Sequence, residues 1–266
     1  MSERTEYAPG EFCWVDLATT DVDGALAFYR ELLGVESELA PVAPEETGGY
    51  RFLVKGGKMI CGYGPAQEGQ PPAWHSYVKV EDAHATAERA KGAGGELIFG
   101  PIDLPNESGR MAVLRDSTGA FISINAQQKH PGAELVNEPG AWRWNNLMTR
   151  DLEAARAFYR EVFGWSATHN EAAPEGIEMW QVEGQRWPEG LGGVMAITDD
   201  LPPEMPSHWQ VYFEVENTDD AIDRTISQGA RLGFGPIDVP AGRIATLVDP
   251  QGAVVSIIES HFPEPR

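Results

Sequence analysis

The chain repeats itself at an offset of about 130 residues, and this constrains its fold more than any other feature of the sequence. Three blocks recur in the same order with small insertions or deletions between them, which chance does not explain. The block pairs are DVDGALAFYRELLG and DLEAARAFYREVFG (21–34 and 151–164), FGPIDLP and FGPIDVP (99–105 and 234–240), and GRMAVLRDSTGAFISI and GRIATLVDPQGAVVSI (109–124 and 242–257). We therefore predict two homologous domains, residues 8–126 and 140–260, joined by a linker over 127–139.

Length, charge and cysteine content restrict the class of protein. The 266 residues suffice for two domains with cores of their own. A net charge of −21 argues against nucleic acid and anionic membrane surfaces as partners. The sequence contains no apolar run of membrane-spanning length, no signal-peptide pattern at its start, and only two cysteines, Cys13 and Cys61. We expect a cytoplasmic protein, monomer or homodimer, whose partner is a small molecule.

Each half reads as two successive strand–helix–strand–strand–strand units. Asp21 is a candidate N-cap for a helix whose apolar residues recur at helical spacing up to Gly34. Gly56 and Gly57 provide the turn of a hairpin. The remaining helix of the first half is expected over 82–92, and its strands over 11–18, 50–55, 58–63, 75–80, 96–99, 111–115 and 120–125. The whole chain then holds four βαβββ units.

These motifs carry a family resemblance. The strand followed by D-x-x-x-A-x-x-F-Y-x-x-x-L/F-G, together with the closing hairpin L-x-D-x-x-G-A-x-x-S-I, resembles the vicinal oxygen chelate superfamily of glyoxalases, bleomycin-resistance proteins and extradiol dioxygenases. The chain is also similar to a two-domain actinobacterial subgroup described as glyoxalase-like or hydroxylase-like antigens. The resemblance implies an α+β fold with cupped mixed sheets, helices outside and a ligand on each concave face.

Strand periodicity agrees with a cup of this kind, because successive side chains of a strand alternate between its faces. His75, Tyr77 and Lys79 share one face of their strand, whereas Val78 and Val80 share the other. The aliphatic face suits packing under a helix. The mixed polar and aromatic face suits a ligand cavity.

Metal-dependent members of the family, as the resemblance implies, take ligands from the first, fifth and last strands of a domain. Those positions hold Trp14, His75 and Ser123 in the first half. The second half has Trp144, Gln210 and Ser256 there. Asp16 could add a second ligand beside His75, but a catalytic divalent ion usually needs about three. We therefore predict no cofactor and disfavour a divalent metal.

Other residues on the same faces suggest metal-free binding or catalysis. His75 and Asp16 are the candidate catalytic acid and base. The candidate ligand-binding residues are Trp14, Tyr77, Ser123 and Arg110 in the first half, and Trp144, Asn146, Gln210, Tyr212 and Ser256 in the second.

Structural roles compete with each of these assignments. Trp14 could fill the core, and Asp16 could hydrogen-bond a neighbouring strand or tyrosine. His75 could be an ordinary sheet histidine. Arg110 and its repeat counterpart Arg243 could pair with the aspartates of the two GPID blocks, 103 and 238, instead of a ligand.

Three functions remain open at this point. The favoured one is binding of a small hydrophobic or aromatic molecule without the usual metal, including metal-free catalysis through Asp16 and His75. The second is a metal-dependent lyase or dioxygenase with a displaced site. The third is a protein-interaction role with vestigial cavities. If only one half is active, we predict the first. It has Asp16 and His75 where the second half has the less reactive Asn146 and Gln210.

Overall fold

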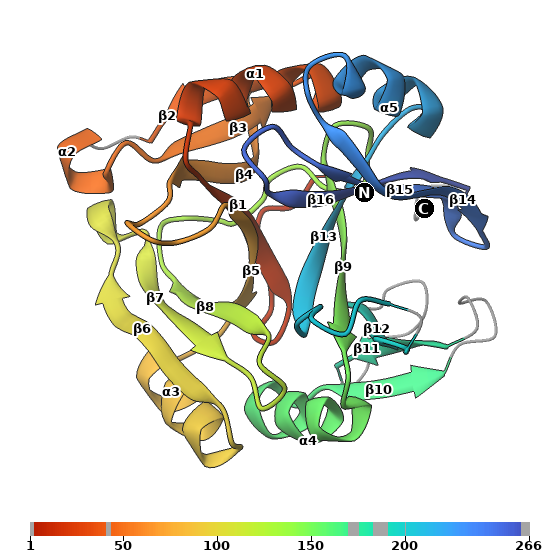
Figure 1. Cartoon of the computed structure of the whole chain (residues 1–266). Coiled ribbons are helices and arrows are strands. Elements are labelled where there is room, and N and C mark those ends of the chain that lie inside the picture. The colour runs from red at the N-terminus through yellow and green to blue at the C-terminus, as the bar shows by residue number, and fades with distance from the viewer. Residues whose placement is uncertain (1–2, 41–43, 170–175, 183–190, 200, 262–266) are drawn as a thin grey trace.

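The computed structural model describes residues 3–40, 44–169, 176–182, 191–199 and 201–261, and they form two eight-stranded mixed sheets with helices outside (Figure 1). The first sheet has the strand order β2-β3-β4-β1-β5-β8-β7-β6, and the second has the order β10-β11-β12-β9-β13-β16-β15-β14. The two orders are the same when the second is renumbered from β9. The α+β class and the tandem repeat predicted from the sequence are therefore confirmed.

The elements of the two halves follow the predicted unit pattern. The first half contains β1 (Phe12–Thr19), α1 (Val22–Leu33), β2 (Glu36–Leu39), α2 (Pro44–Thr47), β3 (Arg51–Lys55), β4 (Lys58–Pro65), β5 (Ala73–Lys79), α3 (Ala83–Gly92), β6 (Glu96–Asp103), the 3₁₀ turn η1 (Pro105–Glu107), β7 (Gly109–Arg115) and β8 (Phe121–Gln127). The second half contains β9 (Trp142–Thr149), α4 (Leu152–Phe163), β10 (Ser166–His169), β11 (Ile177–Gln181), β12 (Gly192–Ala196), β13 (His208–Glu214), α5 (Thr218–Ile226), β14 (Arg231–Val239), β15 (Gly242–Val248) and β16 (Val254–Ser260).

Units pair within a half, not between halves. β1 runs antiparallel to β5, and this pair joins the first unit to the second. On the outer side of the pair, β1 is parallel to β4 and β5 is parallel to β8. The same three pairings recur among β9, β12, β13 and β16. Each half therefore closes its own cup, whose central strands are the first strands of its two units.

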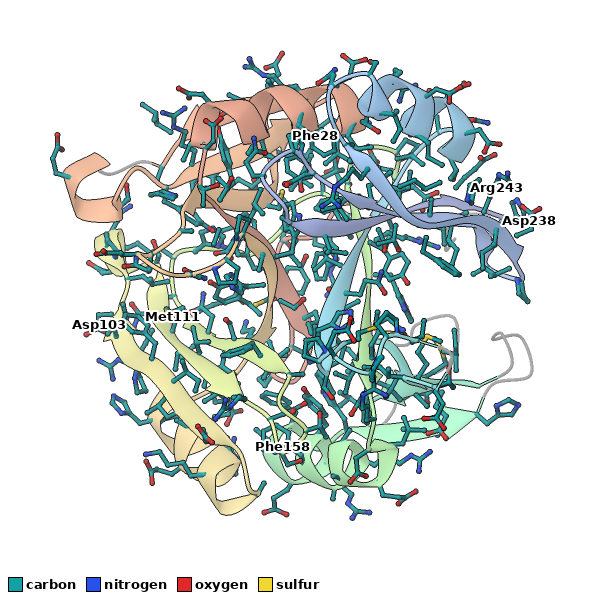
Figure 2. All side chains as sticks on the ribbon, in the orientation of Figure 1. Phe28, Asp103, Met111, Phe158, Asp238 and Arg243 are labelled. Atoms are coloured by element: carbon teal, nitrogen blue, oxygen red, sulfur yellow. The ribbon has the colours of Figure 1, made fainter. Side chains whose placement is uncertain are left out.

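The first helix of each half begins and ends where the sequence indicates. The Asp21 side chain accepts a hydrogen bond from the Gly24 amide, and Asp151 does the same for Ala154. Gly34 and Gly164 end the helices at φ 65° and 72°, a conformation that glycine adopts without steric cost. Phe28 and Phe158, equivalent residues of α1 and α4, are buried beneath these helices (Figure 2).

The two sheets meet back to back at their central strands. The Phe12 ring lies 5.1 Å from that of Trp209, and the Trp74 ring lies 4.9 Å from that of Phe213. Ser76 Oγ donates a hydrogen bond to Asn145 Oδ1 across the same interface. We expected the aliphatic face of β5 to pack under a helix, and for this strand the expectation is wrong. Its partner is the other half, while α3 covers the flanking strands β6 to β8.

Each half also supplies a helix to the other. The Tyr29 hydroxyl of α1 donates to Asp249 of the β15–β16 turn at 3.1 Å, and Tyr159 of α4 donates to Asp116 of the β7–β8 turn at 2.7 Å. As a result α1 lies beside α5, and α3 lies beside α4 (Figure 1). The concave faces of the two sheets are left facing away from each other.

Two further observations complete the fold. β2 was not among the predicted strands, because its Glu-Ser-Glu-Leu sequence is largely exposed and shows no apolar alternation. Within the described ranges, every helix is too short or too polar to cross a lipid bilayer.

Candidate functional site

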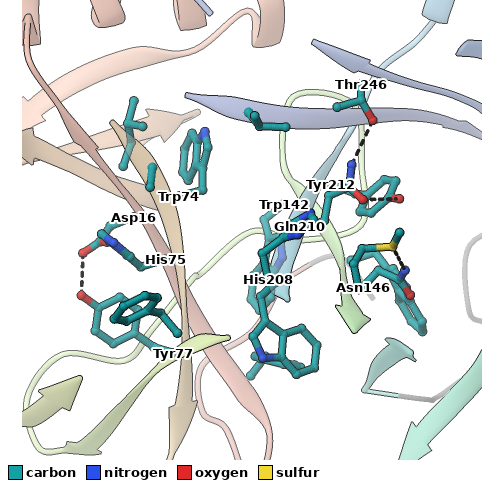
Figure 3. Close-up of a pocket in the computed structure, with 18 of the residues that line it drawn as sticks. Asp16, Trp74, His75, Tyr77, Trp142, Asn146, His208, Gln210, Tyr212 and Thr246 are labelled. Atoms are coloured by element: carbon teal, nitrogen blue, oxygen red, sulfur yellow. Dashed lines mark hydrogen bonds and ion pairs between the residues drawn. The ribbon is translucent and has the colours of Figure 1, made fainter. Parts of the chain in front are cut away.

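The concave face of each sheet forms a cup, here called the first cup (β1–β8) and the second cup (β9–β16). Residues of both cups line a cavity of about 2160 Å³ (Figure 3). Because the concave faces point away from each other, this volume combines the space of the two cups, and it exceeds the about 300–1,000 Å³ that is usual for one drug-sized ligand.

A carboxylate lies at the centre of the first cup. Asp16 of β1 is aligned with His75 on one neighbouring strand and with Gly62 on the other. Only 8% of the residue is exposed, so its charge is largely removed from water. A buried carboxylate needs hydrogen-bond donors to offset the lost hydration.

Three side chains supply those donors. The hydroxyls of Tyr77 and Tyr50 donate to Asp16 Oδ2 at 2.9 and 3.0 Å. Nδ1 of His75 lies 3.2 Å from Asp16 Oδ1. Burial, followed by the negative charge of Asp16, holds the pKa of both tyrosines well above the usual value. The two phenols therefore remain protonated and act as donors at neutral pH.

This arrangement determines which nitrogen of His75 can accept a proton. Because a carboxylate only accepts, Nδ1 carries the hydrogen, and in the neutral ring Nε2 has the free lone pair. Nε2 lies 3.3 Å from Nε2 of Gln70, which lines the cavity on the segment before β5. The accepting nitrogen of His75, Nε2, thus points away from Asp16 and towards Gln70, whose side chain a ligand could displace.

Tyr50 is a site residue that the sequence analysis missed. It lies across β4, where a Cβ on Gly62 would fall 1.8 Å from its hydroxyl and one on Gly64 would fall 3.1 Å from its ring. Trp14 Nε1 donates to the same hydroxyl at 2.9 Å. Glycines within a strand indicate close approach of another group, and Gly62 and Gly64 are the signal that could have revealed this contact.

Trp14 lies beneath this network and is not among the described residues that line the cavity. Its ring contacts Phe52 and His130 edge to face, with centroids 5.8 and 4.6 Å away. Burial lowers the pKa of His130 to about 4, so its ring is neutral near pH 7. The structure therefore places Trp14 in the aromatic floor of the cup, which matches the core-filling alternative for this residue.

The other side of the first cup is apolar. Ser123 is buried beside Tyr77 on β8, and Val113 of β7 and Phe99 of β6 continue this row across the sheet. Val113 and Phe99 line the cavity together with Met111 and Phe121. A ligand in this cup would have polar partners at one end and a hydrophobic surface at the other.

The second cup has a neutral floor. Nε2 of Gln210 donates to Ser256 Oγ at 2.6 Å. Figure 3 shows its other two bonds, from Nε2 to Thr246 Oγ1 at 2.9 Å and from the Tyr212 hydroxyl to Oε1 at 3.3 Å. Burial raises the pKa of Tyr212 to about 12. Asn146 replaces Asp16, and the register places Ile177 where the first cup has Tyr50. Trp144 lines this cup, unlike its counterpart Trp14.

Arg110 lies outside this arrangement. Its guanidinium donates to both carboxylate oxygens of Asp103, at 2.8 and 3.0 Å, on the exposed edge of the first sheet. Arg243 forms ion pairs with Asp238 of the second sheet, which lies close to it in Figure 2, and with Asp219 of α5. Both arginines are absent from the cavity lining that the described residues form, so the geometry favours the structural ion pairs over ligand contacts.

The donor set of the first cup does not match a divalent metal site. Among the described residues at its centre, Asp16 and His75 are the two side chains of the usual metal-ligand types, and both Asp16 oxygens already accept hydrogen bonds. Within the described part of the chain, no three His, Cys, Asp or Glu side chains gather closely enough to hold a metal. Two ligands, one of them fully engaged, fall short of the usual three.

Comparison with known sequences gives the same two-part division. A family model described as "Glyoxalase/Bleomycin resistance protein/Dioxygenase superfamily" matches residues 12–124 and 143–257. The chain is 35% identical over 267 residues to "Putative glyoxylase CFP32" of Mycobacterium tuberculosis, covering 97% of this chain and 98% of that protein. It is 32% identical over 270 residues to "Anthracycline biosynthesis protein DauV" of Streptomyces sp. (strain C5), covering 96% and 95%.

Solved structures with the same fold are more distant in sequence. The Mn(II)-bound glyoxalase from Novosphingobium aromaticivorans aligns with a TM-score of 0.62 at 15% identity, over 97% of this chain and 83% of that one. The 2,3-dioxygenase LapB from Pseudomonas sp. KL28 aligns with a TM-score of 0.63 at 13% identity, over 96% and 94%. At these identities the likeness concerns the fold alone.

Proposed function

The chain belongs to the glyoxalase/bleomycin resistance protein/dioxygenase superfamily, and from this premise we propose that its first cup binds a hydroxylated aromatic molecule without a divalent metal. The observation that carries the proposal is the hydrogen-bonded set of Asp16, His75, Tyr50 and Tyr77 at the floor of an otherwise apolar cavity. Its polar end suits a ligand hydroxyl, and its apolar side suits an aromatic ring.

His75 is the group that would contact the ligand hydroxyl. With Nδ1–H directed to Asp16, Nε2 accepts a hydrogen bond in place of Gln70. An acidic hydroxyl can then transfer its proton to Nε2, which leaves an oxyanion on the ligand and an imidazolium on His75. The Asp16 carboxylate stabilises that imidazolium, the role that a buried aspartate has beside a catalytic histidine. The same contacts serve binding alone or binding followed by base catalysis.

The ring of the ligand would lie on the apolar side of the cup. Phe99 and Phe121 are about half exposed at its mouth, and Val113 and Met111 lie further inside. Aromatic and thioether side chains favour flat rings. The relative named for anthracycline biosynthesis supports the same class, because anthracyclines are polycyclic phenols.

Calorimetric titration with 2-naphthol and 2-methoxynaphthalene tests this proposal. The two probes have the same ring system, but only the naphthol can donate a proton to His75. We expect 2-naphthol to bind the intact protein at least about tenfold more tightly, which corresponds to one good hydrogen bond. His75→Gln and Asp16→Asn, which introduce the residues of the second cup, should each remove that preference.

Tyr212→Phe, a change in the second cup, is the matched control and should leave the preference intact. Equal affinity of the unmodified protein for the two probes would sink the proposal. The metal content of untagged protein purified without chelators provides a separate check. One divalent ion per chain would favour the metal-dependent alternative, whereas a content near zero agrees with metal-free binding.

A further inference from the structure

The second cup has a floor whose polar groups mostly satisfy one another. Both amide hydrogens of Gln210 are directed to hydroxyls, of Ser256 and Thr246, and its carbonyl oxygen accepts from Tyr212. A further hydrogen bond joins the hydroxyls of Thr246 and Ser256, whose oxygens are 2.8 Å apart. These groups carry no charge at neutral pH, and this floor has no counterpart of the Asp16–His75 pair.

Asn146 is the exception in this floor. It is 3% exposed, and its Oδ1 has no hydrogen-bond partner among the described residues. Within the described ranges its Nδ2 donates to the thioether of Met148 alone, at 3.6 Å, and a thioether is a weak acceptor. A half-turn of the side chain exchanges its oxygen and nitrogen, and in either orientation this buried amide lacks a good partner for its donor and for its acceptor.

The amide is held at the surface of the cup by the strand beside it. A Cβ on Gly193 of β12 would fall 2.1 Å from Asn146 Oδ1, so the glycine makes room for the amide. Both strands belong to the concave face, and Asn146 lines the cavity. Trp142, at the start of the same strand, also lines the cavity and has a buried indole N–H without a partner in the described ranges.

The walls around the amide are soft and apolar. Met148, Met179, Met195 and Met205 line this part of the cavity, four of the seven methionines in the chain, with Ile177 and Trp144 beside them. Methionine adapts its shape to a ligand and makes favourable contacts with the edges of aromatic rings. Arg143 also lines the cavity, but its Nε lies 3.4 Å from the buried carboxylate of Glu214, which neutralises its charge.

We propose that the second cup is a separate binding site for an uncharged, flat aromatic molecule that carries a neighbouring hydrogen-bond donor and acceptor, such as an aromatic carboxamide. The amide of Asn146 pairs with that donor and acceptor, and the methionine walls hold the ring. An anion is excluded because burial would remove its hydration without an unpaired cation to replace it. This proposal concerns a different cup and ligand class, and it stands or falls independently of the first cup.

Titration of the full chain with naphthalene-2-carboxamide and naphthalene-2-carboxylate tests the second site. The probes share one ring system, and at neutral pH only the carboxylate is charged. We expect saturable binding of one carboxamide per chain, at least tenfold tighter than the carboxylate. Asn146→Leu should weaken carboxamide binding about tenfold, because one hydrogen-bonded pair is lost.

Met195→Glu gives a second test that does not depend on the buried amide, because Met195 is half-buried and its replacement need not disturb the core. The introduced charge on the wall should abolish carboxamide binding. Phe121→Glu places the same charge at the mouth of the first cup and should leave it unchanged, as should Asp16→Asn. Absence of saturable binding, a preference for the carboxylate, or an equal loss in Phe121→Glu would overturn the proposal.

Discussion

The two cups share a frame and differ in their floors. Both use a first strand paired with the first strand of the next unit, and both place a glycine of the fourth strand, Gly62 or Gly193, opposite the key polar residue. Above Gly62 the space is filled by Tyr50, which donates to Asp16. Above Gly193 it is filled by Asn146 itself. One duplicated backbone thus supports a charged, fully bonded floor and a neutral, partly unbonded one.

Unlike the floors of the cups, the contacts between the halves are the same in both directions. Tyr29 donates to Asp249 and accepts from Trp74, and Tyr159 makes the equivalent contacts with Asp116 and Trp209. Burial, and then the adjacent aspartate charge, keeps the pKa of both tyrosines well above the ordinary value. The comparison indicates that the frame constrains both halves equally, whereas the floors have been free to change.

The largest expected effect tests whether the equivalent contacts of Tyr29 and Tyr159 contribute equally to stability. Tyr29→Phe and Tyr159→Phe each remove a buried hydroxyl that joins a tryptophan N–H to an aspartate, which leaves both partners short of a hydrogen bond. We expect each variant to lose roughly 3 kcal/mol of unfolding free energy, and the two losses to agree. Chemical denaturation of the full chain measures both.

Tyr63→Phe is the control, because the hydrogen bond of the Tyr63 hydroxyl in the described part of the chain lies within one half, to Ser37. Its loss should be smaller, about 1 kcal/mol. A large difference between Tyr29→Phe and Tyr159→Phe would break the comparison, since the two halves would then not contribute equally to the interface.

The second prediction concerns acid stability, where the halves should differ. His130 packs on Trp14, whereas Trp144 has no aromatic neighbour in the described part of the chain. The pKa of His130 is about 4 in the folded protein and 6.5 ordinarily. The unfolded chain therefore binds a proton that the folded chain does not, so stability is complete above pH 6.5 and falls as the pH approaches 4. The loss is about 2–3 kcal/mol.

Denaturation of the protein and of His130→Phe across this pH range isolates the effect. Many carboxylates also titrate as the pH approaches 4, so the informative quantity is the difference between the two proteins. We expect that difference to shift in favour of His130→Phe as the pH falls from 6.5 to 4. A constant difference would show that the histidine does not titrate in this way.

A transplant of the charged floor sharpens the comparison further. Asn146→Asp, Gln210→His and Ile177→Tyr together reproduce, in the second cup, the residues that surround Asp16. We expect the triple variant to bind a second equivalent of 2-naphthol with about 2 kcal/mol of added affinity, roughly thirtyfold. Asn146→Asp alone should not, because its new carboxylate lacks the histidine and tyrosine donors. A single equivalent in the triple variant would mean that these residues do not define the site.

Much of this frame could be read from the sequence because its signals are local or repeated. The caps Asp21 and Asp151 and the closing blocks of the two halves predicted four βαβββ units. Strand alternation placed His75 and Tyr77 on one face of their strand, and the family resemblance implied that Asp16 lies near His75; the structure joins all three through hydrogen bonds. The sequence could also anticipate the Arg110–Asp103 pair, because both residues recur with their neighbours in the second half.

The remaining features depend on contacts between distant segments. Tyr50 reaches Asp16 across β4, and His130 reaches Trp14 from the predicted linker, so neither is visible in any periodicity. The burial of β5 against the other half follows from how the cups pair, which a single-strand pattern does not reveal. The duplicated Phe-Tyr pair of α1 and α4 indicated important residues, but their partners lie in the opposite half.

The smallest expected effect concerns residues that should contribute slightly to stability and not at all to ligand binding in the cups. Arg110→Ala removes one exposed ion pair with Asp103, and Arg243→Ala removes two, with Asp219 and Asp238. Solvent screening makes such pairs weak, so we expect Arg110→Ala to lower the melting temperature by under about 2 °C, and Arg243→Ala by slightly more because it also loses its bond to α5. Neither change should alter the affinity for 2-naphthol, since both guanidinium groups lie outside the cavity lining. Weaker naphthol binding in Arg110→Ala alone would instead restore Arg110 as a ligand-binding residue and would make the edge of the first sheet part of its cup.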